Sequence, residues 1–251
     1  SGYNPLANTD DGSCIAVVIG CTDPLYIEYD PNANTDDNSC VTIIVYGCTD
    51  STAFNYNALA NTDDGSCTYP LAIGDTYQGG IIFYILQPGD IGYVAGQVNG
   101  LIAAPSDLAN QSTGAVWGCS GTAISGADGT AIGTGAQNTD SILAGCSTPG
   151  IAAELCANYT DGTYSDWFLP SKDELNQMYL NIGQGNALGL GNVGVFANFY
   201  YWSSTEFGSN YAWKQGFNYG FPSSIASKDG YNGVRAVRAF GNLALYGCTD
   251  A

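Results

Sequence analysis

Cysteine thiols and carboxylates are the side chains with which this chain could do chemistry. The sequence contains nine cysteines and 23 acidic residues, but only five lysines and arginines and no histidine. Without histidine, neither the Ser–His and Cys–His pairs that activate nucleophiles nor an imidazole-bound metal site can form. The chemistry left to the chain is disulfide formation and the binding of cations by carboxylate and amide oxygens.

The spacing of the cysteines favours disulfides over metal binding. No two cysteines have the C-x-x-C spacing that is typical of zinc sites. Disulfides persist outside the reducing cytosol, so the sequence predicts an extracellular, secreted protein at a cell surface.

A repeated block positions most of these residues. Residues 20–40 and 47–67 align without a gap, beginning with Gly-Cys-Thr-Asp and ending with Asn-Thr-Asp-Asp-x-Ser-Cys. We predict a partial repeat over 1–19, repeats over 20–46 and 47–72, and the start of another over 243–251. The chain is interpreted as a segment of a longer array of small, mostly β or irregular repeats.

The fixed spacing inside each block predicts its disulfide. The two cysteines of a block are 19 residues apart, whereas the distances between blocks vary. This favours Cys21–Cys40 and Cys48–Cys67, with Cys14 and Cys248 unpaired within the chain. The alternative register, Cys14–Cys21 and Cys40–Cys48 with Cys67 and Cys248 flanking the larger domain, stays open because connectivity is not decided by sequence.

The larger domain contains three further cysteines. We pair Cys119 with Cys146 and predict that Cys156, on the apolar face of a short helix, is a buried free thiol.

A block of this length cannot enclose a core, so other interactions must hold it together. A disulfide that closes such a loop contributes about 3 kcal/mol. Calcium is a second candidate, since each block concentrates hard oxygen ligands. The candidate ligands are Asp23, Asn34, Asp36, Asp37, Asp50, Asn61, Asp63 and Asp64. The alternative is that these residues form Asx turns that need no ion, and their spacing does not fit the EF-hand pattern.

The charge balance excludes several classes of partner. The net charge is −18, and residues 1–70 carry ten acidic side chains and no basic one. A nucleic-acid binder needs basic side chains to displace phosphate counterions, and an anionic membrane would repel the chain. Because no apolar run approaches the roughly 20 residues of a membrane-spanning helix, membrane insertion is not expected. The apolar linkers 15–19 and 42–46 are predicted to be strands that pack one repeat onto the next.

Residues 73–242 have the pattern of a larger α+β domain. We predict strands over 79–86, 92–95, 101–104 and 234–240. We predict one helix over 151–159 and a second from the capping box at Ser171 to about Ile182. Strands at both ends predict termini that meet in one sheet, which suits insertion into a repeat array.

Three segments of this domain resemble a known family. The segments 166–175, 201–206 and 234–238 (Asp-Trp-Phe-Leu-Pro-Ser-Lys-Asp-Glu-Leu, Tyr-Trp-Ser-Ser-Thr-Glu and Val-Arg-Ala-Val-Arg) are similar to the domain of unknown function numbered 1566. That family includes the C-terminal domain of a collagen-like adhesin. The resemblance implies a C-type-lectin-like fold, a surface location and, for some members, binding of sulphated glycans. The repeats are similar to those of large secreted bacterial adhesins. The Glu-Pro-Asn and Trp-Asn-Asp signatures of calcium-dependent sugar sites are absent from the sequence.

Aromatic and basic residues near the end of this domain are the candidates for ligand binding. Ten aromatic residues lie between Phe199 and Phe221, and all five basic residues lie between Lys172 and Arg238. Exposed rings could stack on a sugar or contact a partner protein; the alternative, favoured for Trp202 and Trp213, is that they form the core. Arg235 or Arg238 could also pair internally with Glu206, Asp166 or Glu174, so an anionic ligand is not predicted. The candidates are Tyr211, Trp213, Lys214, Tyr219, Tyr231 and Arg235.

These observations predict a protein that is not an enzyme. The adjacent acids Asp173 and Glu174 are explained by helix capping, and no nucleophile, base and orienting group occur together. Formylglycine-generating enzymes share the broad fold and use a cysteine site, but nothing here places two reactive thiols in a polar pocket.

We predict an adhesin module that contacts surface glycans or proteins, further repeats or copies of the same chain. The alternative is a structural segment of an extracellular fibre, sheath or virion tail fibre.

Overall fold

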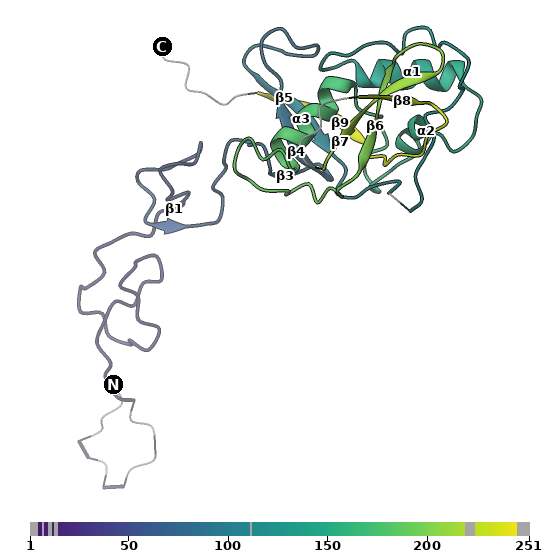
Figure 1. Cartoon of the computed structure of the whole chain (residues 1–251). Helices are drawn as coiled ribbons and strands as arrows, with labels where there is room; N and C mark the ends of the chain where they lie inside the picture. The colour runs from purple at the N-terminus through teal and green to yellow at the C-terminus, as the bar shows by residue number, and fades with distance from the viewer. Residues whose placement is uncertain are drawn as a thin grey trace. The chain divides into compact units, whose positions relative to one another are not determined.

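The computed structural model describes residues 5–6, 8–9, 12, 15–110, 112–218 and 224–244. The chain divides between Pro70 and Leu71 into two compact units. We refer to the described residues up to Pro70 as the repeat unit and to those from Leu71 onward as the large unit. Figure 1 labels most of the helices and strands of both.

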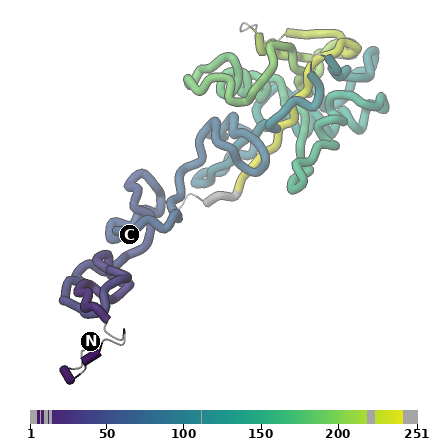
Figure 2. The backbone as a smooth tube through the Cα atoms, turned by 90° about the horizontal axis from the view of Figure 1, so that it is seen from below, coloured from purple at the N-terminus to yellow at the C-terminus, as the bar shows by residue number. Residues whose placement is uncertain are grey.

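The repeat unit has little regular structure. Its two strands, β1 (Tyr46–Gly47) and β2 (Thr62–Asp63), are two residues long and pair in parallel. The remainder consists of turns and isolated bridges, and Figure 2 shows the chain winding through successive irregular loops. Among the described residues of this unit, only Cys21, Cys48 and Ala53 count as buried hydrophobic residues. The unit therefore lacks a hydrophobic core of useful size.

The linkers are extended but do not form the strands expected over 15–19 and 42–46. Ile19 makes a single bridge to Thr35, and only Tyr46 of the second linker belongs to a strand. Their aliphatic side chains are mostly exposed, because the small blocks provide no apolar surface to cover them. The second linker still connects neighbouring blocks through its backbone. Ile44 donates a hydrogen bond to the carbonyl of Leu25 in one block, and the Val45 carbonyl accepts from residues 61 and 62 in the next.

Two antiparallel sheets form the framework of the large unit. The first has the order β3 (Thr76–Tyr77), β4 (Gly80–Ile85), β5 (Gln97–Ala103), β9 (Val237–Ala244). The second has the order β6 (Tyr200–Glu206), β7 (Tyr211–Gly216), β8 (Ser224–Ser227). The first and last strands of the unit share one sheet, as the sequence predicts.

The strand expected over 92–95 is instead a turn. Gly92 and Gly96 have φ values of 90° and 78°, which side-chain-bearing residues rarely adopt. The chain here forms the loop between β4 and β5, and β5 begins only at Gln97.

Three helices cover the sheets. Two lie where the sequence predicts them: α2 (Ala152–Ala157) and α3 (Lys172–Ile182), which begins with the expected capping box of Ser171 and Glu174. The third, α1 (Gly135–Gly145), was not expected, because glycines stand at both of its ends and Thr134 provides no side-chain cap. The helix is held by tertiary contacts such as buried Ile142. The large unit is thus an α+β fold.

Two clusters of buried side chains form the core of the large unit. One surrounds Trp117, Ile142 and Trp202, and the other surrounds Phe83, Met178 and Phe217. No helix in the described part of the chain is both long and apolar enough to span a bilayer.

Candidate binding surface

Three disulfides join the described cysteines. They are Cys21–Cys40, Cys48–Cys67 and Cys119–Cys146, the pairs favoured by the sequence, and the alternative register does not form. Cys156 is a buried free thiol, and burial raises its pKa far above the ordinary value. Cys14 and Cys248 lie outside the described residues.

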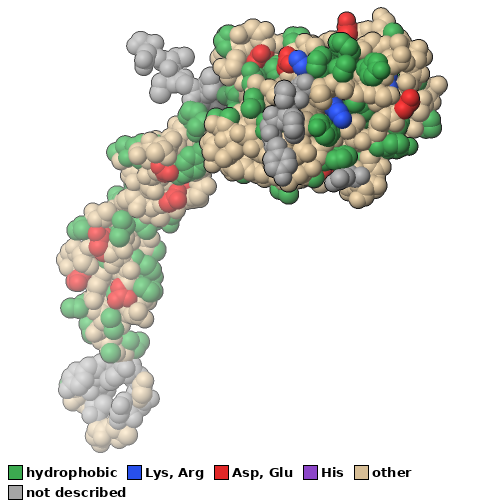
Figure 3. All heavy atoms as spheres, viewed as in Figure 1, with side chains coloured by type: hydrophobic (Ala, Val, Ile, Leu, Met, Phe, Trp, Pro, Cys, Tyr) green, Lys and Arg blue, Asp and Glu red, His purple; other side chains and the backbone are tan. Residues whose placement is uncertain are grey.

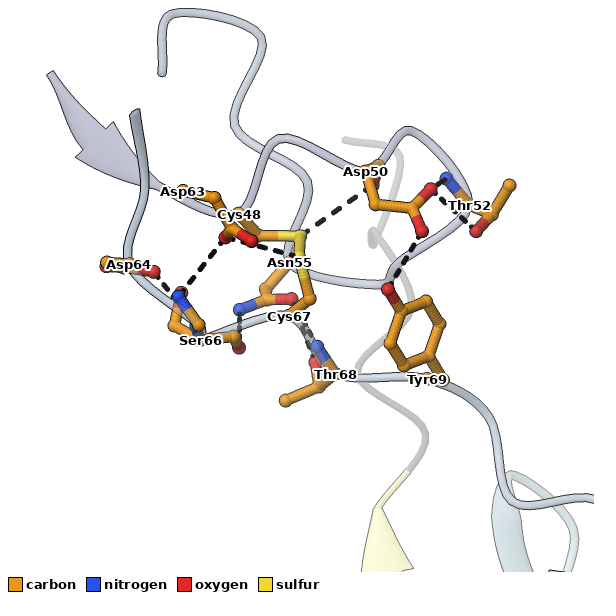
Figure 4. Close-up of a disulfide and its surroundings, with 11 residues drawn as sticks. Cys48, Asp50, Thr52, Asn55, Asp63, Asp64, Ser66, Cys67, Thr68 and Tyr69 are labelled. Carbon is orange, nitrogen blue, oxygen red and sulfur yellow. Dashed lines mark hydrogen bonds between the residues drawn. A yellow bond between two sulfur atoms is a disulfide. The ribbon is translucent and has the colours of Figure 1, made fainter. Parts of the chain in front are cut away.

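The aspartates of the second block accept hydrogen bonds from their own turns (Figure 4). Asp50 Oδ1 accepts from the backbone N–H and the hydroxyl of Thr52, at 2.8 and 2.7 Å, and its Oδ2 accepts from the Tyr69 hydroxyl at 2.8 Å. These bonds favour the charged form and lower the pKa of Asp50. Asp63 and Asp64 accept backbone N–H groups two residues further on.

The first block repeats this arrangement. Asp23, Asp36 and Asp37 each accept the backbone N–H two residues further along the chain. These contacts are the Asx turns of the alternative interpretation. Within the described residues, no group of three or more acidic or cysteine side chains is arranged to hold a metal ion. Calcium binding by these residues stays a prediction.

Asn34 and Asn61, the two amides among the candidate calcium ligands, fasten the linkers. Asn34 Oδ1 accepts from Val18 N at 3.1 Å, and its Nδ2 donates to the carbonyl of Ala16 at 2.7 Å. Asn61 makes the equivalent bonds to Val45 N and the Ile43 carbonyl, both at 2.9 Å. Each block thus uses one asparagine to hold the linker that precedes it.

Arg235 is not a surface ligand contact, contrary to the sequence-based expectation. The residue is 1% exposed, and its guanidinium binds Asp107 at 2.7 Å and the carbonyls of Ala104 and Gly194. A charge buried to this extent is stable only with such partners. The side chain therefore organises the interior and cannot reach a ligand at the surface.

Other basic side chains are paired inside the large unit as well. Lys228 is buried and binds Glu206 and the carbonyl of Thr122, while Arg238 binds Asp166. Lys214 lies over the Tyr200 ring, 3.9 Å from its centroid, and partial burial lowers the pKa of its ammonium.

Four apolar side chains lie together at the outer face of the second sheet. Trp213 on β7 is directly opposite Ile225 on β8, and Tyr211 lies two residues before Trp213 on the same face. Phe207 packs edge-on against the Trp213 indole, with 5.5 Å between ring centroids. Phe207 and Tyr211 are 50% and 47% exposed, Ile225 is exposed and Trp213 is half-buried. We call Phe207, Tyr211, Trp213 and Ile225 the aromatic platform.

One cation borders the aromatic platform. The Lys172 ammonium lies 4.8 Å from the centroid of the Trp213 ring and 3.8 Å from Asp173. Alternation along β8 could have indicated Ile225 from the sequence. No sequence pattern places Phe207 and Lys172 beside Trp213. The position of Phe207 depends on the turn after β6, and that of Lys172 depends on how α3 packs in the fold.

The remaining candidates lie elsewhere. Tyr231 is 70% exposed but packs beside Gly114, and Tyr219 lies outside the described residues. The strand β7 ends at Gly216, and Phe217, directly after it, is buried in the core. Of the predicted ligand contacts that the structure describes, it brings together on the aromatic platform only Tyr211 and Trp213.

The described chain is an α+β unit joined to disulfide-bonded repeats. It matches no protein-family model, and no curated protein is significantly similar to it.

Proposed function

We propose that the chain is a non-enzymatic extracellular binding module whose large unit, a C-type-lectin-like domain, contacts surface glycans or proteins. The observation that carries this proposal is the aromatic platform. Most other large aromatic side chains of the second sheet, such as Tyr201 and Trp202, are buried, whereas Phe207 and Tyr211 are open to solvent. The similarity of three sequence segments to an adhesin-containing family and the three disulfides support the same interpretation.

The chemistry of the aromatic platform suits an uncharged ligand with both apolar and hydroxyl-bearing faces. Ring faces stack on the apolar side of a sugar, while the Tyr211 hydroxyl and the Lys172 ammonium can bond to its hydroxyl groups. A single ammonium next to Asp173 does not outweigh the net charge of −18, so a polyanionic ligand is disfavoured. Neutral glycans are therefore the proposed ligand class.

The acidic and thiol side chains that could suggest catalysis have structural roles in this chain. Glu174 belongs to the capping box of α3, and the Cys156 thiol is buried with a raised pKa, which keeps it protonated and unreactive. A catalytic site needs a nucleophile, a base and an orienting group in contact. These uses support a binding role.

The proposal predicts that neutral glycan binding depends on Trp213 and Tyr211. In a glycan array followed by calorimetry, Trp213→Ala and Tyr211→Ala should each weaken binding about tenfold, because stacking on one ring is worth about 1–1.5 kcal/mol. Tyr231→Ala is the matched control, since Tyr231 is exposed but lies outside the aromatic platform. Equal losses in all three variants, or an array without neutral glycans among its positives, would contradict the proposal.

An extracellular fibre or sheath is the second candidate function. The observation that favours it is the set of exposed aliphatic side chains along the linkers, including Ile15, Val17, Ile19 and Ile43. Such surface is unusual in a monomer and is typical of contacts between chains. The acidic side chains of the repeat unit, several of which are shown in red in Figure 3, would oppose contact between repeat units at low salt. Electron microscopy of the purified chain distinguishes isolated molecules from ordered fibres.

A further inference from the structure

Each complete block consists of two halves that bind each other. In the second block, we call residues 43–51, from the linker through Gly-Cys-Thr-Asp-Ser, the leading half, and residues 56–67, which end at the second cysteine, the closing half. β1 lies in the leading half and β2 in the closing half, and the two strands pair in parallel. A block thus forms where a leading half meets a closing half.

Main-chain hydrogen bonds and one disulfide hold the halves of the second block together. The Val45 carbonyl accepts from Asn61 N at 3.0 Å, and Asn61 Oδ1 accepts from Val45 N at 2.9 Å. The Cys48 carbonyl accepts from Asn57 N at 2.9 Å, and Cys48 forms its disulfide with Cys67 (Figure 4). Apart from the cysteine sulfur, the leading half contributes backbone groups to these contacts, so other aliphatic side chains can take the place of its own.

The first block shows that the same contacts form with other side chains. The Val18 carbonyl accepts from Asn34 N at 2.8 Å, and Asn34 Oδ1 accepts from Val18 N at 3.1 Å. The Cys21 carbonyl accepts from Asp30 N at 3.0 Å, where the second block uses Asn57. The two blocks share the asparagine, the cysteine pair and the backbone contacts.

The sequence contains one further leading half and one further closing half, far apart along the chain. Residues 243–251 match the leading half 43–51 at its tyrosine, glycine, cysteine, threonine and aspartate, and aliphatic residues occupy the first three positions of both. Residues 3–14 are identical to the closing half 56–67 at eleven of twelve positions. The residue types that make the contacts are retained: Asn4, Asn8, Cys14 and Cys248 stand where the second block has Asn57, Asn61, Cys67 and Cys48.

The further leading half begins inside the large unit. Leu243 and Ala244 are the last two residues of β9 and pair with Val98 and Gln97 of β5. β9 is the outermost strand on its side of the sheet. A segment that is already extended loses less conformational entropy when it binds, and an edge strand readily adds a segment of another chain.

We propose that residues 243–251 of one copy bind residues 3–14 of a second copy and complete a block between them. The sequence of each half selects the other, because the same two patterns bind each other in both complete blocks. Since each copy carries one half of each kind, the contact is head-to-tail and adds copies in series. The inference goes beyond glycan binding and does not depend on it, and it supplies the joint for a fibre, the second candidate function.

The complete blocks specify the contacts of this joint. Asn8 of the second copy bonds to the backbone of Leu245 in the first, and Cys248 forms a disulfide with Cys14. The disulfide forms by exchange with a small-molecule disulfide such as oxidised glutathione: the two thiols lose two electrons and two protons, and two molecules of reduced glutathione are released. The aspartates of the joint match those that the complete blocks already accommodate, so the negative charge of the chain does not prevent the contact.

The first test asks whether copies become linked through these two cysteines. The 251-residue chain is equilibrated in a glutathione redox buffer and run on a non-reducing gel. We expect a ladder of dimers and longer oligomers, and mass spectrometry of proteolytic peptides should find Cys14 joined to Cys248. A chain that stays monomeric, including a monomer that joins its own Cys14 to its own Cys248, would overturn the proposal.

Mixing two variants tests the direction of the joint. Cys14→Ser keeps Cys248, and Cys248→Ser keeps Cys14, so each variant alone should stay monomeric. An equimolar mixture should form one disulfide-linked dimer that does not grow further. If each variant dimerises alone as readily as the mixture does, the linkage is random thiol oxidation and the joint is refuted.

A third variant separates recognition from thiol chemistry. Asn8→Ala removes the side chain that holds Leu245, so the ratio of linked to free chains at equal glutathione should fall about tenfold. Asn4→Ala is the matched control and should link like the wild type, because the equivalent Asn57 side chain accepts a turn hydrogen bond from Leu59 N within its own half. Equal linkage by Asn8→Ala and the wild type would contradict the proposed contact. None of these variants alters the aromatic platform, so a failure of glycan binding is distinguishable from a failure of the joint.

Discussion

Glu174 connects two parts of the large unit from a buried position. Its carboxylate accepts hydrogen bonds from Ser171 N and Gly133 N, both at 2.7 Å, and from Gly135 N at 3.4 Å. The residue thus caps its own helix and holds the start of α1. Burial raises the pKa of Glu174 to about 7 from the ordinary 4.5, although the three N–H donors favour the charged form.

Glu174 should make stability fall as the pH rises towards neutrality. Its pKa is higher in the folded state, so the folded protein binds the proton more tightly, and this stabilisation is complete below about pH 4.5 and lost as the pH passes about 7. The shift corresponds to about 3 kcal/mol at most. Denaturant unfolding of wild-type protein and Glu174→Gln between about pH 5 and 8 should show a smaller pH slope for the variant.

The variant should also be less stable at low pH. The glutamine NH₂ group faces backbone donors and replaces an acceptor, which costs about 1–3 kcal/mol. Asp173→Asn is the control, because the Asp173 side chain is half-exposed, and it should leave the slope unchanged. Equal slopes for wild type and Glu174→Gln would show that Glu174 is charged throughout this range.

Local sequence predicted the capping role of Glu174 and offered Asp166 as an internal partner for an arginine, which Arg238 binds, but it did not predict the burial of Arg235. The S-x-x-E pattern with a preceding proline specifies a helix start by short-range hydrogen bonds alone. Whether Arg235 faces solvent depends on Asp107, far away in the sequence, which reaches it only in the folded unit. The hydroxyl of Tyr201 also binds Asp107, while its ring packs against Phe196 and Phe217 in the core.

At the scale of elements, the asparagine of each block determines how firmly its linker is held. Asn34 and Asn61 bond to equivalent backbone groups of successive linkers, so the two blocks fold in the same way. The linkers have no buried face, so these bonds replace the packing that a normal strand would have.

Removing one asparagine should loosen one linker. Asn61→Ala loses the bonds to Val45 N and the Ile43 carbonyl, each worth about 0.5–1.5 kcal/mol. Limited digestion with a protease that cleaves after aromatic residues should become faster at Tyr46. Asn57→Ala, which loses only the turn bond to Leu59 N, should be cleaved at the wild-type rate. If both variants are cleaved equally fast, the asparagine does not hold the linker.

The sequence predicted those elements whose signal lies in a few neighbouring residues. It did not predict elements that depend on contacts with distant parts of the fold. Alternation and β-branched residues indicated β4 and β9, and the helix-capping pattern indicated α3. The polar, glycine-flanked α1 and the turn at Gly92 depend on their surroundings, and the aromatic platform depends on the pairing of β7 with β8.

At the scale of the whole molecule, the two units are stabilised by different forces. The repeat unit relies on disulfides and turns, whereas the large unit has two hydrophobic clusters. Loss of a disulfide in a segment without a core removes about 3 kcal/mol, which a few exposed hydrogen bonds do not replace.

Reduction should therefore unfold the repeat unit selectively. With a phosphine reductant, hydrogen exchange should show loss of protection over 15–70, while amides of β4, β5 and β9 stay protected. A variant with Cys119→Ala and Cys146→Ala should keep protection in the repeat unit under oxidising conditions. Protected repeat amides after complete reduction of Cys21–Cys40 and Cys48–Cys67 would contradict this expectation.

The confinement of all lysines and arginines to the large unit has a consequence for the lifetime of the protein among secreted proteases. An enzyme of trypsin specificity, which requires a basic residue before the bond it cleaves, has no target before Lys172. Beyond that point, Lys228 and Arg235 are buried and ion-paired. The repeat unit, which lacks a hydrophobic core, therefore contains no cleavage site for this class of enzyme. Its turnover depends on proteases that recognise aromatic or aliphatic side chains.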